Sequence, residues 1–181
     1  MTEPLQFHLT LYPEPVLRKV AVDVPAFDDD LRATVRAMFD LMYQSNGVGL
    51  AAPQVGLQKR ILVLNATGKP EDELALVNVT IVDRTGEPSL YEEGCLSFPG
   101  IYAEVKRPER CRVKAFSPDG ATIEREFDGF VSRIVQHEYD HLEGVLLVDR
   151  MSAADKQRHK AALQELVDRY RSRASSAART R

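Results

Sequence analysis

Cysteine is scarce in this chain, whose 181 residues include only Cys95 and Cys111. Two cysteines cannot build the framework of disulfide bonds that stabilises a small secreted protein, so a reducing compartment is expected. Each thiol is then a candidate metal ligand, a nucleophile or a small core residue.

Long apolar runs are also missing. No stretch approaches the ~20 apolar residues that cross a bilayer, and the first residues carry neither the basic region nor the apolar core of a secretory signal. A formal charge of −3 provides no strong positive field, so a nucleic-acid partner is not indicated. We therefore expect a cytoplasmic protein with no membrane segment and no direct nucleic-acid site.

The chain shows no internal repeat and no linker rich in Pro, Gly or Ser that would divide it. Its length suits one domain with a substantial core. The last residues are rich in Arg, Ser and Ala, a composition typical of a solvated end. We predict one domain over residues 1–170 and a basic, flexible tail over 171–181.

Hydrophobic periodicity predicts an α+β fold. A first helix should follow the cap residues 28–30 and end near Asn46 and Gly47, with Gly47 in a left-handed cap. Strands are predicted at residues 60–65, 74–82, 112–116 and 121–127, the last two joined by a turn at 117–120. We expect antiparallel or mixed sheets around a central helix, with an N-terminal helix and a C-terminal helix.

The central helix should begin after Gly129 and end at Gly144, and it carries the sequence His-Glu-x-x-His. Residues four apart lie on one face of a helix, so His137 and His141 can bind one metal ion. Glu138 would then stand beside an open metal position as a proton acceptor. The pattern is typical of metal hydrolases.

A catalytic metal of this kind usually has three protein ligands. Leu147 stands where a metzincin has its third histidine, and Ala161 stands at the distance of the glutamate in thermolysin-like enzymes. Glu165, on the predicted C-terminal helix, remains an alternative. Cys95 is the leading candidate, since a Cys/His/His set suits Zn or Fe(II). Cys111 has no comparable context and is predicted to be a core residue.

A glycine-rich segment precedes the cysteine segment, over residues 46–54. Gly47 and Gly49 would allow an extended ligand to lie close to the backbone. Gln54 could then donate an amide N–H to a developing oxyanion. A purely structural turn is the competing interpretation.

Together, Gly-Val-Gly-Leu-Ala-Ala-Pro-Gln at 47–54, Glu-Gly-Cys-Leu-Ser at 93–97 and Gln-His-Glu-Tyr-Asp-His at 136–141 resemble the signatures of peptide deformylases. These metal hydrolases remove the formyl group from the N-terminal methionine of new proteins. The resemblance implies that one divalent metal, Fe(II) in the cell and Zn, Ni or Co in purified protein, is bound by Cys95, His137 and His141.

The resemblance also implies a mechanism. Metal-bound hydroxide attacks the formyl carbon, Glu138 acts as general base and then as general acid, and formate is released. Gln54 and the backbone N–H of Leu96 hold the oxyanion. The substrates are formyl-methionyl N-termini of nascent chains, and the ribosome is a candidate transient partner of the basic tail.

The substrate would lie along the glycine-rich segment as an added strand. The methionine side chain would enter an apolar pocket near Leu50, Ile134 and His137. Arg133, one turn before His137, either lines the rim of this pocket or pairs with a carboxylate at the surface. The substrate-binding residues implied by the resemblance are Val48, Gly49, Leu50, Glu93, Gly94, Arg133 and Ile134.

Overall fold

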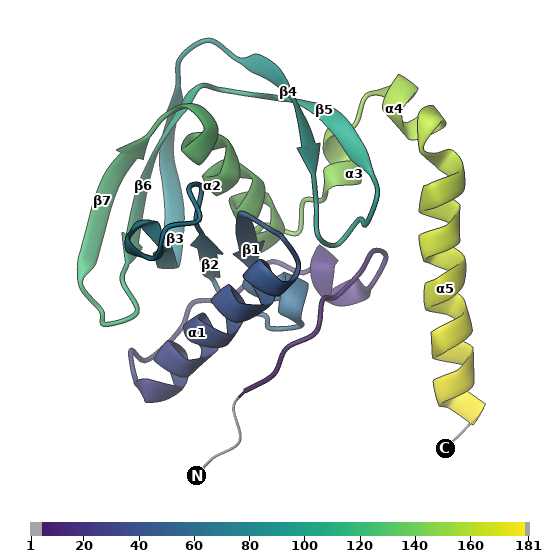
Figure 1. The fold of residues 1–181 in the computed structure, drawn as a ribbon, viewed down its shortest axis with the longest axis horizontal. Helices are drawn as coiled ribbons and strands as arrows, with labels where there is room; N and C mark the ends of the chain where they lie inside the picture. Colours follow the sequence, from purple (N-terminus) through teal and green to yellow (C-terminus); the bar gives the residue numbers. More distant parts are fainter. Residues whose placement is uncertain (1–4, 180–181) are drawn as a thin grey trace.

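The computed structural model describes residues 5–179, with side chains described as far as residue 176. Within this range the chain forms five α-helices and two antiparallel sheets (Figure 1), which confirms the predicted α+β class. The strands are β1 (Gly49–Ala51), β2 (Ile61–Leu64), β3 (Leu74–Thr85), β4 (Ser89–Gly94), β5 (Tyr102–Arg107), β6 (Arg110–Phe116) and β7 (Thr122–Phe127). The order is β1-β2-β3-β6-β7 in the larger sheet and β4-β5 in the smaller.

The chain contains α-helices and short 3-10 helices. The α-helices are α1 (Asp29–Gln44), α2 (Gly129–Leu142), α3 (Leu147–Arg150), α4 (Ala153–Arg158) and α5 (Lys160–Arg179), and the 3-10 helices are η1 (Pro15–Arg18), η2 (Ala52–Val55) and η3 (Pro70–Asp72). Among the described residues, no helix is both long and apolar enough to cross a membrane.

The alternation of side chains along β2 explains why α1 and α2 cover opposite faces of the larger sheet. Ile61 and Val63 pack in a cluster with the apolar residues of α1. Leu62 and Leu64 point the other way and pack in a cluster with Ile134 and other residues of α2. Because successive strand residues face opposite sides, a strand buried on both sides reads as a continuous apolar run.

The two-stranded sheet β4-β5 forms a separate hairpin beside α2 (Figure 1). Strand β5 alternates between exposed and buried residues, and its inward residues Ala103 and Val105 pack in a third cluster with Phe98 and residues of α3 and α5. The helix α2 therefore contacts the larger sheet on one side and the hairpin on another. The sequence analysis did not predict this hairpin.

The end of α1 differs from the expected left-handed glycine. Asp28 caps the start as predicted, accepting a hydrogen bond from the Leu31 N–H at 2.9 Å. At the other end Asn46 adopts the left-handed conformation, with φ of 56°, which asparagine tolerates better than most residues. Gly47 instead leaves room for a neighbouring side chain, because a Cβ there would lie 2.8 Å from Cδ1 of Leu96.

The C-terminal helix is divided. Ser152 caps α4 by accepting a hydrogen bond from the Asp155 N–H, but the helix is interrupted at His159 before α5 begins. Figure 1 shows α5 at one side of the molecule, where Leu166 anchors its first half. Residues 171–179 belong to this helix, while residues 180–181 lie outside the described residues. The flexibility of this segment stays a prediction.

Candidate metal centre

Three protein donors meet where the end of β4 faces α2. The ligand-type atoms of Cys95, His137 and His141 all lie within 4.8 Å of one another, and Sγ of Cys95 is 3.3 Å from Nε2 of His141. Cys95 and His137 are partly buried and His141 is fully buried. One thiol and two imidazoles at this spacing form a donor set that suits Zn or Fe(II).

The alternative third ligand lies elsewhere. Glu165 is exposed on α5 and pairs with Arg169, four residues later on the same helix. Leu147 is buried in the cluster beneath the β4-β5 hairpin. Cys111 is a core residue whose thiol faces the carbonyl of Ser132 at 3.9 Å. Among the described residues, Cys95 is therefore the side chain that completes the set with the two histidines.

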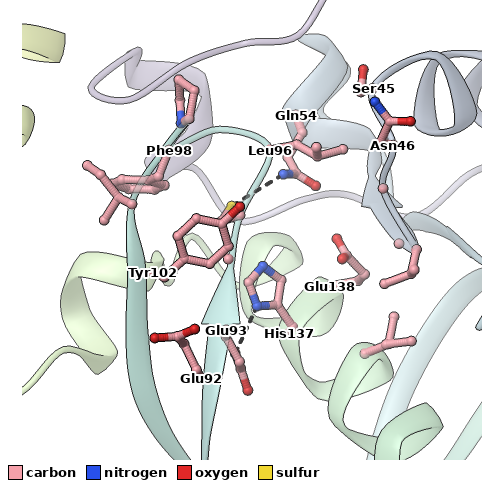
Figure 2. Close-up of a pocket in the computed structure, with 18 of the residues that line it drawn as sticks. Ser45, Asn46, Gln54, Glu92, Glu93, Leu96, Phe98, Tyr102, His137 and Glu138 are labelled. Carbon is pink, nitrogen blue, oxygen red and sulfur yellow. Dashed lines mark hydrogen bonds and ion pairs between the residues drawn. The ribbon is translucent and has the colours of Figure 1, made fainter.

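Glu93 fixes the orientation of one of the histidine rings. Its Oε2 lies 2.9 Å from Nδ1 of His137, so Nε2 of the same ring is left to face the thiol side (Figure 2). Arg107 donates two hydrogen bonds to this carboxylate, at 2.7 and 2.9 Å, and Arg133 donates a third at 2.8 Å. Burial raises the pKa of Glu93, but the hydrogen bonds from His137 and Arg107 outweigh it and lower the pKa to about 2.

Arg107 extends this charge network to a second carboxylate. It donates to Oδ2 of Asp140 at 2.8 Å, and Arg150 donates to both oxygens of the same carboxylate at 2.5 and 3.0 Å. Asp140 lies between the two histidines in the sequence of α2. The arginine thus ties the β4-β5 hairpin to the helix that carries the imidazoles. Sequence reasoning missed Arg107, Asp140 and Arg150.

Glu138 is a buried carboxylate with an open oxygen. Its Oε2 has no hydrogen-bond partner within the described part of the chain, and its side chain lines the cleft. Burial raises the pKa of Glu138 to about 7, although the charges of His137 and Arg107 oppose the shift. A carboxylate with this pKa can accept a proton and return it near neutral pH.

Burial also acts on the two imidazoles. It lowers the pKa of His141 well below the usual value, helped by the charges of His137 and Arg107. Burial lowers the pKa of His137 too, but its hydrogen bonds to Cys95 and Glu93 outweigh that effect and raise the pKa well above the usual value. A neutral imidazole is the form that binds a metal, and the lowered pKa of His141 favours that form.

Gln54 approaches the thiol from the side opposite Glu93. It lies in η2 and is buried, its Oε1 accepts a hydrogen bond from the Ala51 N–H at 2.9 Å, and its Nε2 lies 3.6 Å from Sγ of Cys95 (Figure 2). The amide nitrogen therefore directs an N–H at the donor set, where a reacting oxygen would be held.

The donor set opens into a cleft of about 720 Å³. The predicted residues that line it are Gln54, Val48, Gly49, Glu93, Gly94, Cys95, Leu96, Arg133, Ile134, His137 and Glu138. Leu50, a predicted substrate contact, does not line it, because the alternation along β1 turns its side chain into the core beside α1. His141 lies beneath the cleft.

One edge of β1 is unpaired among the described strands, since β1 pairs with β2 alone. Val48, just before this strand, is 41% exposed at the cleft. Gly49 keeps the strand close to α2, because a Cβ there would lie 2.5 Å from Oε1 of Glu138 and 2.7 Å from Cγ2 of Ile134. The glycine thus serves packing within the protein as well as any approach by a ligand.

Arg133 is buried, so it does not lie at the surface, but it both lines the cleft and pairs with a carboxylate, that of Glu93. Besides Glu93, it donates to the carbonyls of Val105 and Ser89, at 2.9 Å each. Its guanidinium lies 5.4 Å from the centre of the Tyr91 ring. The arginine therefore lines the cleft but offers it little free charge, since its donors are used within the protein.

Exposed aromatic rings border the cleft. Tyr91, Tyr102 and Phe130 are about half exposed and line it together. Tyr102 lies on β5 opposite Gly94, and its ring lines the same cleft as His137 (Figure 2). Sequence reasoning missed these rings, because nothing in their local pattern distinguishes a rim residue from an ordinary surface aromatic.

Comparison with known proteins gives one consistent result. The family model for polypeptide deformylase matches residues 7–157. Peptide deformylase 1B, chloroplastic, of Oryza sativa subsp. japonica is 43% identical over 161 residues, a match that covers 88% of this chain and 60% of that longer protein. Peptide deformylase of Thermotoga sp. (strain RQ2) is 43% identical over 150 residues, which cover 83% of this chain and 90% of that protein.

Solved structures agree with the sequence relatives. The crystal structure of peptide deformylase from Plasmodium falciparum superimposes with a TM-score of 0.89 at 42% identity, covering 91% of this chain and 98% of that chain. The chain therefore belongs to the polypeptide deformylase family, whose members are enzymes.

Proposed function

We propose that the protein hydrolyses the formyl group from formyl-methionyl N-termini of nascent polypeptides and releases formate. The family supports removal of N-terminal formyl groups in general. The observation that carries the proposal for this chain is the carboxylate of Glu138, buried and with an open oxygen, beside a Cys/His/His donor set. A hydrolase needs such a proton acceptor where water and substrate meet.

Cys95, His137 and His141 would hold one divalent metal. We propose Fe(II) in the cell and Zn, Ni or Co in protein purified in air, since each accepts a thiolate with two imidazoles. When bound, the metal supplies Lewis-acid chemistry, because it polarises a carbonyl oxygen and lowers the pKa of water toward ~7. Glu93 would keep the His137 ring oriented for this role.

The residues of the chain account for the proton transfers. Glu138 takes a proton from the attacking water as the water oxygen bonds to the formyl carbon. Negative charge then develops on the formyl oxygen, where the Gln54 amide and the Leu96 backbone N–H donate hydrogen bonds. When the C–N bond breaks, Glu138 returns the proton to the leaving amine. The products are formate and a free N-terminus.

The cleft would position the peptide. Its backbone would add to the unpaired edge of β1 beside Val48 and Gly49. The methionine side chain would lie against Ile134 and the aromatic rim, because an unbranched thioether makes favourable contacts with rings. Leu50 is left out of this proposal because it lies in the core.

The compartment and the partners belong to the same proposal. The rice relative is named chloroplastic, so the family does not fix the compartment. For this chain we propose the cytoplasm, a reducing compartment that keeps the Cys95 thiol available. Contact between the exposed arginines of α5 and the ribosome stays a prediction.

The decisive experiment is a formate-release assay on a formyl-methionyl tripeptide under anaerobic conditions. The wild-type protein should release formate, and Glu138→Ala should retain the metal but lose turnover by about 10²–10⁴-fold. Glu165→Ala, which removes an exposed carboxylate, is the matched control and should retain both metal and turnover. No formate from the metal-loaded wild type would refute the proposal.

A further inference from the structure

The hydroxyl of Ser97 is a buried polar group that the proposed reaction does not use. Ser97 is 0% exposed, two residues after Cys95, and its side chain does not line the cleft. A buried hydroxyl needs a hydrogen-bond partner. Its partner is Gln54, whose Nε2 donates to Oγ of Ser97 at 3.2 Å.

The contacts of Gln54 fix which way its amide points. The Ala51 N–H can only donate, so the atom that it meets at 2.9 Å must be the amide oxygen. The amide nitrogen then faces Ser97 at 3.2 Å and the Cys95 sulfur at 3.6 Å. One N–H is used by the serine hydroxyl, and the other is directed at the thiol side of the donor set.

The backbones of the two partners are held together by a third segment. The Thr10 N–H donates to the carbonyl of Gln54 at 2.7 Å, and the Tyr12 N–H donates to the carbonyl of Ser97 at 3.0 Å. The Tyr12 ring also stacks on Phe98, with centroids 4.9 Å apart. The Gln54 segment and the Ser97 segment are therefore fixed to the same short stretch of chain.

We propose that Ser97 is a positioning residue that holds the Gln54 amide so that one N–H faces the reacting oxygen. This inference rests on the proposed function, in which Gln54 donates to the developing oxyanion. Without the hydroxyl, the amide would keep its contact with Ala51 but could rotate about its remaining side-chain bonds. A donor preorganised in place stabilises a transition state far better than a mobile one.

The expected effect falls on turnover. Ser97→Ala removes one neutral hydrogen bond, so kcat should fall by about tenfold, less than the ~10²–10³ expected when the Gln54 donor itself is lost. KM should stay within twofold of the wild-type value, because the unpaired β1 edge and the cleft walls are untouched. Bound metal should be unchanged, and rates are normalised to it.

Ser132→Ala is the matched control. Ser132 is also 0% exposed and its hydroxyl also accepts from a glutamine, at 3.1 Å from Nε2 of Gln136, but neither residue lines the cleft. Both variants therefore remove one buried serine hydroxyl that accepts a hydrogen bond from a glutamine. Unchanged kcat in Ser132→Ala with reduced kcat in Ser97→Ala would separate positioning from general destabilisation.

A double-mutant cycle tests whether Ser97 acts through Gln54. In a Gln54→Leu background, Ser97→Ala should cost no further activity. If it still lowers kcat by about tenfold, or if Ser97→Ala alone has wild-type kcat, the positioning role is wrong. A wild-type protein without formate release would instead point to failure of the proposed function.

A second readout does not depend on turnover. In ¹⁵N spectra of zinc-loaded protein, the Gln54 side-chain amide should exchange its hydrogens at least about tenfold more slowly in wild type and Ser132→Ala than in Ser97→Ala. The signal is assigned by its loss in Gln54→Leu. Equal exchange in wild type and Ser97→Ala would overturn the proposal, even for a protein that shows no deformylation.

Discussion

The two sides of the donor set are held by different kinds of interaction. On the His137 side, Glu93 and Arg107 are each about 5–6% exposed and form a buried ionic network with Asp140 and Arg133. On the opposite side, Gln54 is held by neutral hydrogen bonds. Buried charges cost much to separate from their partners, whereas a neutral hydrogen bond contributes about 1 kcal/mol.

This difference divides the tasks of the site. The ionic side, formed by Glu93 and Arg107, fixes the ligand His137. It also joins the β4-β5 hairpin to α2, so its loss should affect folding and metal binding. The neutral side, formed by Gln54, keeps an amide N–H next to the Cys95 thiol, so its loss should affect turnover. Four substitutions test this division.

Arg107→Met should have the largest effect on stability. It leaves the buried carboxylates of Glu93 and Asp140 without their shared partner, which should lower the free energy of unfolding by about 3–5 kcal/mol. Urea unfolding and metal content measure the outcome. Arg112→Met, which removes a half-exposed arginine paired with Glu124 at 3.6 Å, is the control and should cost less than about 1 kcal/mol. Equal losses in the two variants would contradict a structural role for the buried network.

Gln54→Leu should show the opposite pattern. Turnover should fall by about 10²–10³, equivalent to about 2.7–4 kcal/mol of activation free energy, because an oxyanion donor is lost. The free energy of unfolding should fall by only about 1–2 kcal/mol, since the unpaired groups left behind are neutral. Formate release measures the turnover, urea unfolding measures the stability, and metal content is determined for the same samples. Loss of metal from this variant would show that the neutral side also holds the ligands.

Arg133→Met should be milder than Arg107→Met. Glu93 keeps Arg107 and His137 as partners, and the unbranched methionine fills the space of the arginine stem, so a loss of about 1.5–3 kcal/mol is expected. Urea unfolding of both variants at the same pH measures the difference. Identical losses would mean that the two arginines are equivalent supports for Glu93.

Arg150→Ala should have the smallest effect. Its side chain is 43% exposed, and Asp140 keeps its hydrogen bond from Arg107, so the loss should stay within about 1 kcal/mol and shrink in high salt. Unfolding measured at low and high ionic strength tests this. A larger, salt-independent loss would place Arg150 within the buried network.

The sequence predicted the main helix and its motif because the pattern is periodic and local. Gly129 and Gly144, both with positive φ, mark the ends of that helix as expected. The third ligand lies outside this helix, and Leu147 and Ala161, which stand where other zinc hydrolases have it, indicated Cys95 instead. The β4-β5 hairpin was missed because β4 is almost fully exposed and offers no apolar alternation.

The charge network was missed because charged residues in a sequence are usually interpreted as solvent-exposed. Arg107 carried a usable signal, since the alternation of Ala103 and Val105 places it on the inward face of β5. An inward-facing arginine predicts a buried carboxylate partner. The partners themselves could not be predicted, because Glu93, Asp140 and Arg107 meet only through the packing of the hairpin on α2.

The two hydrogen bonds from Thr10 and Tyr12 have a consequence for folding during synthesis of the protein. The donor set joins Cys95 to His137 and His141, and Thr10 and Tyr12 fix the neighbouring Gln54 and Ser97 segments, so the contacts of the centre are long-range. During its own synthesis the centre cannot form until the segment carrying His141 has left the ribosome. An enzyme proposed to act on emerging N-termini therefore cannot act on its own N-terminus at that early stage.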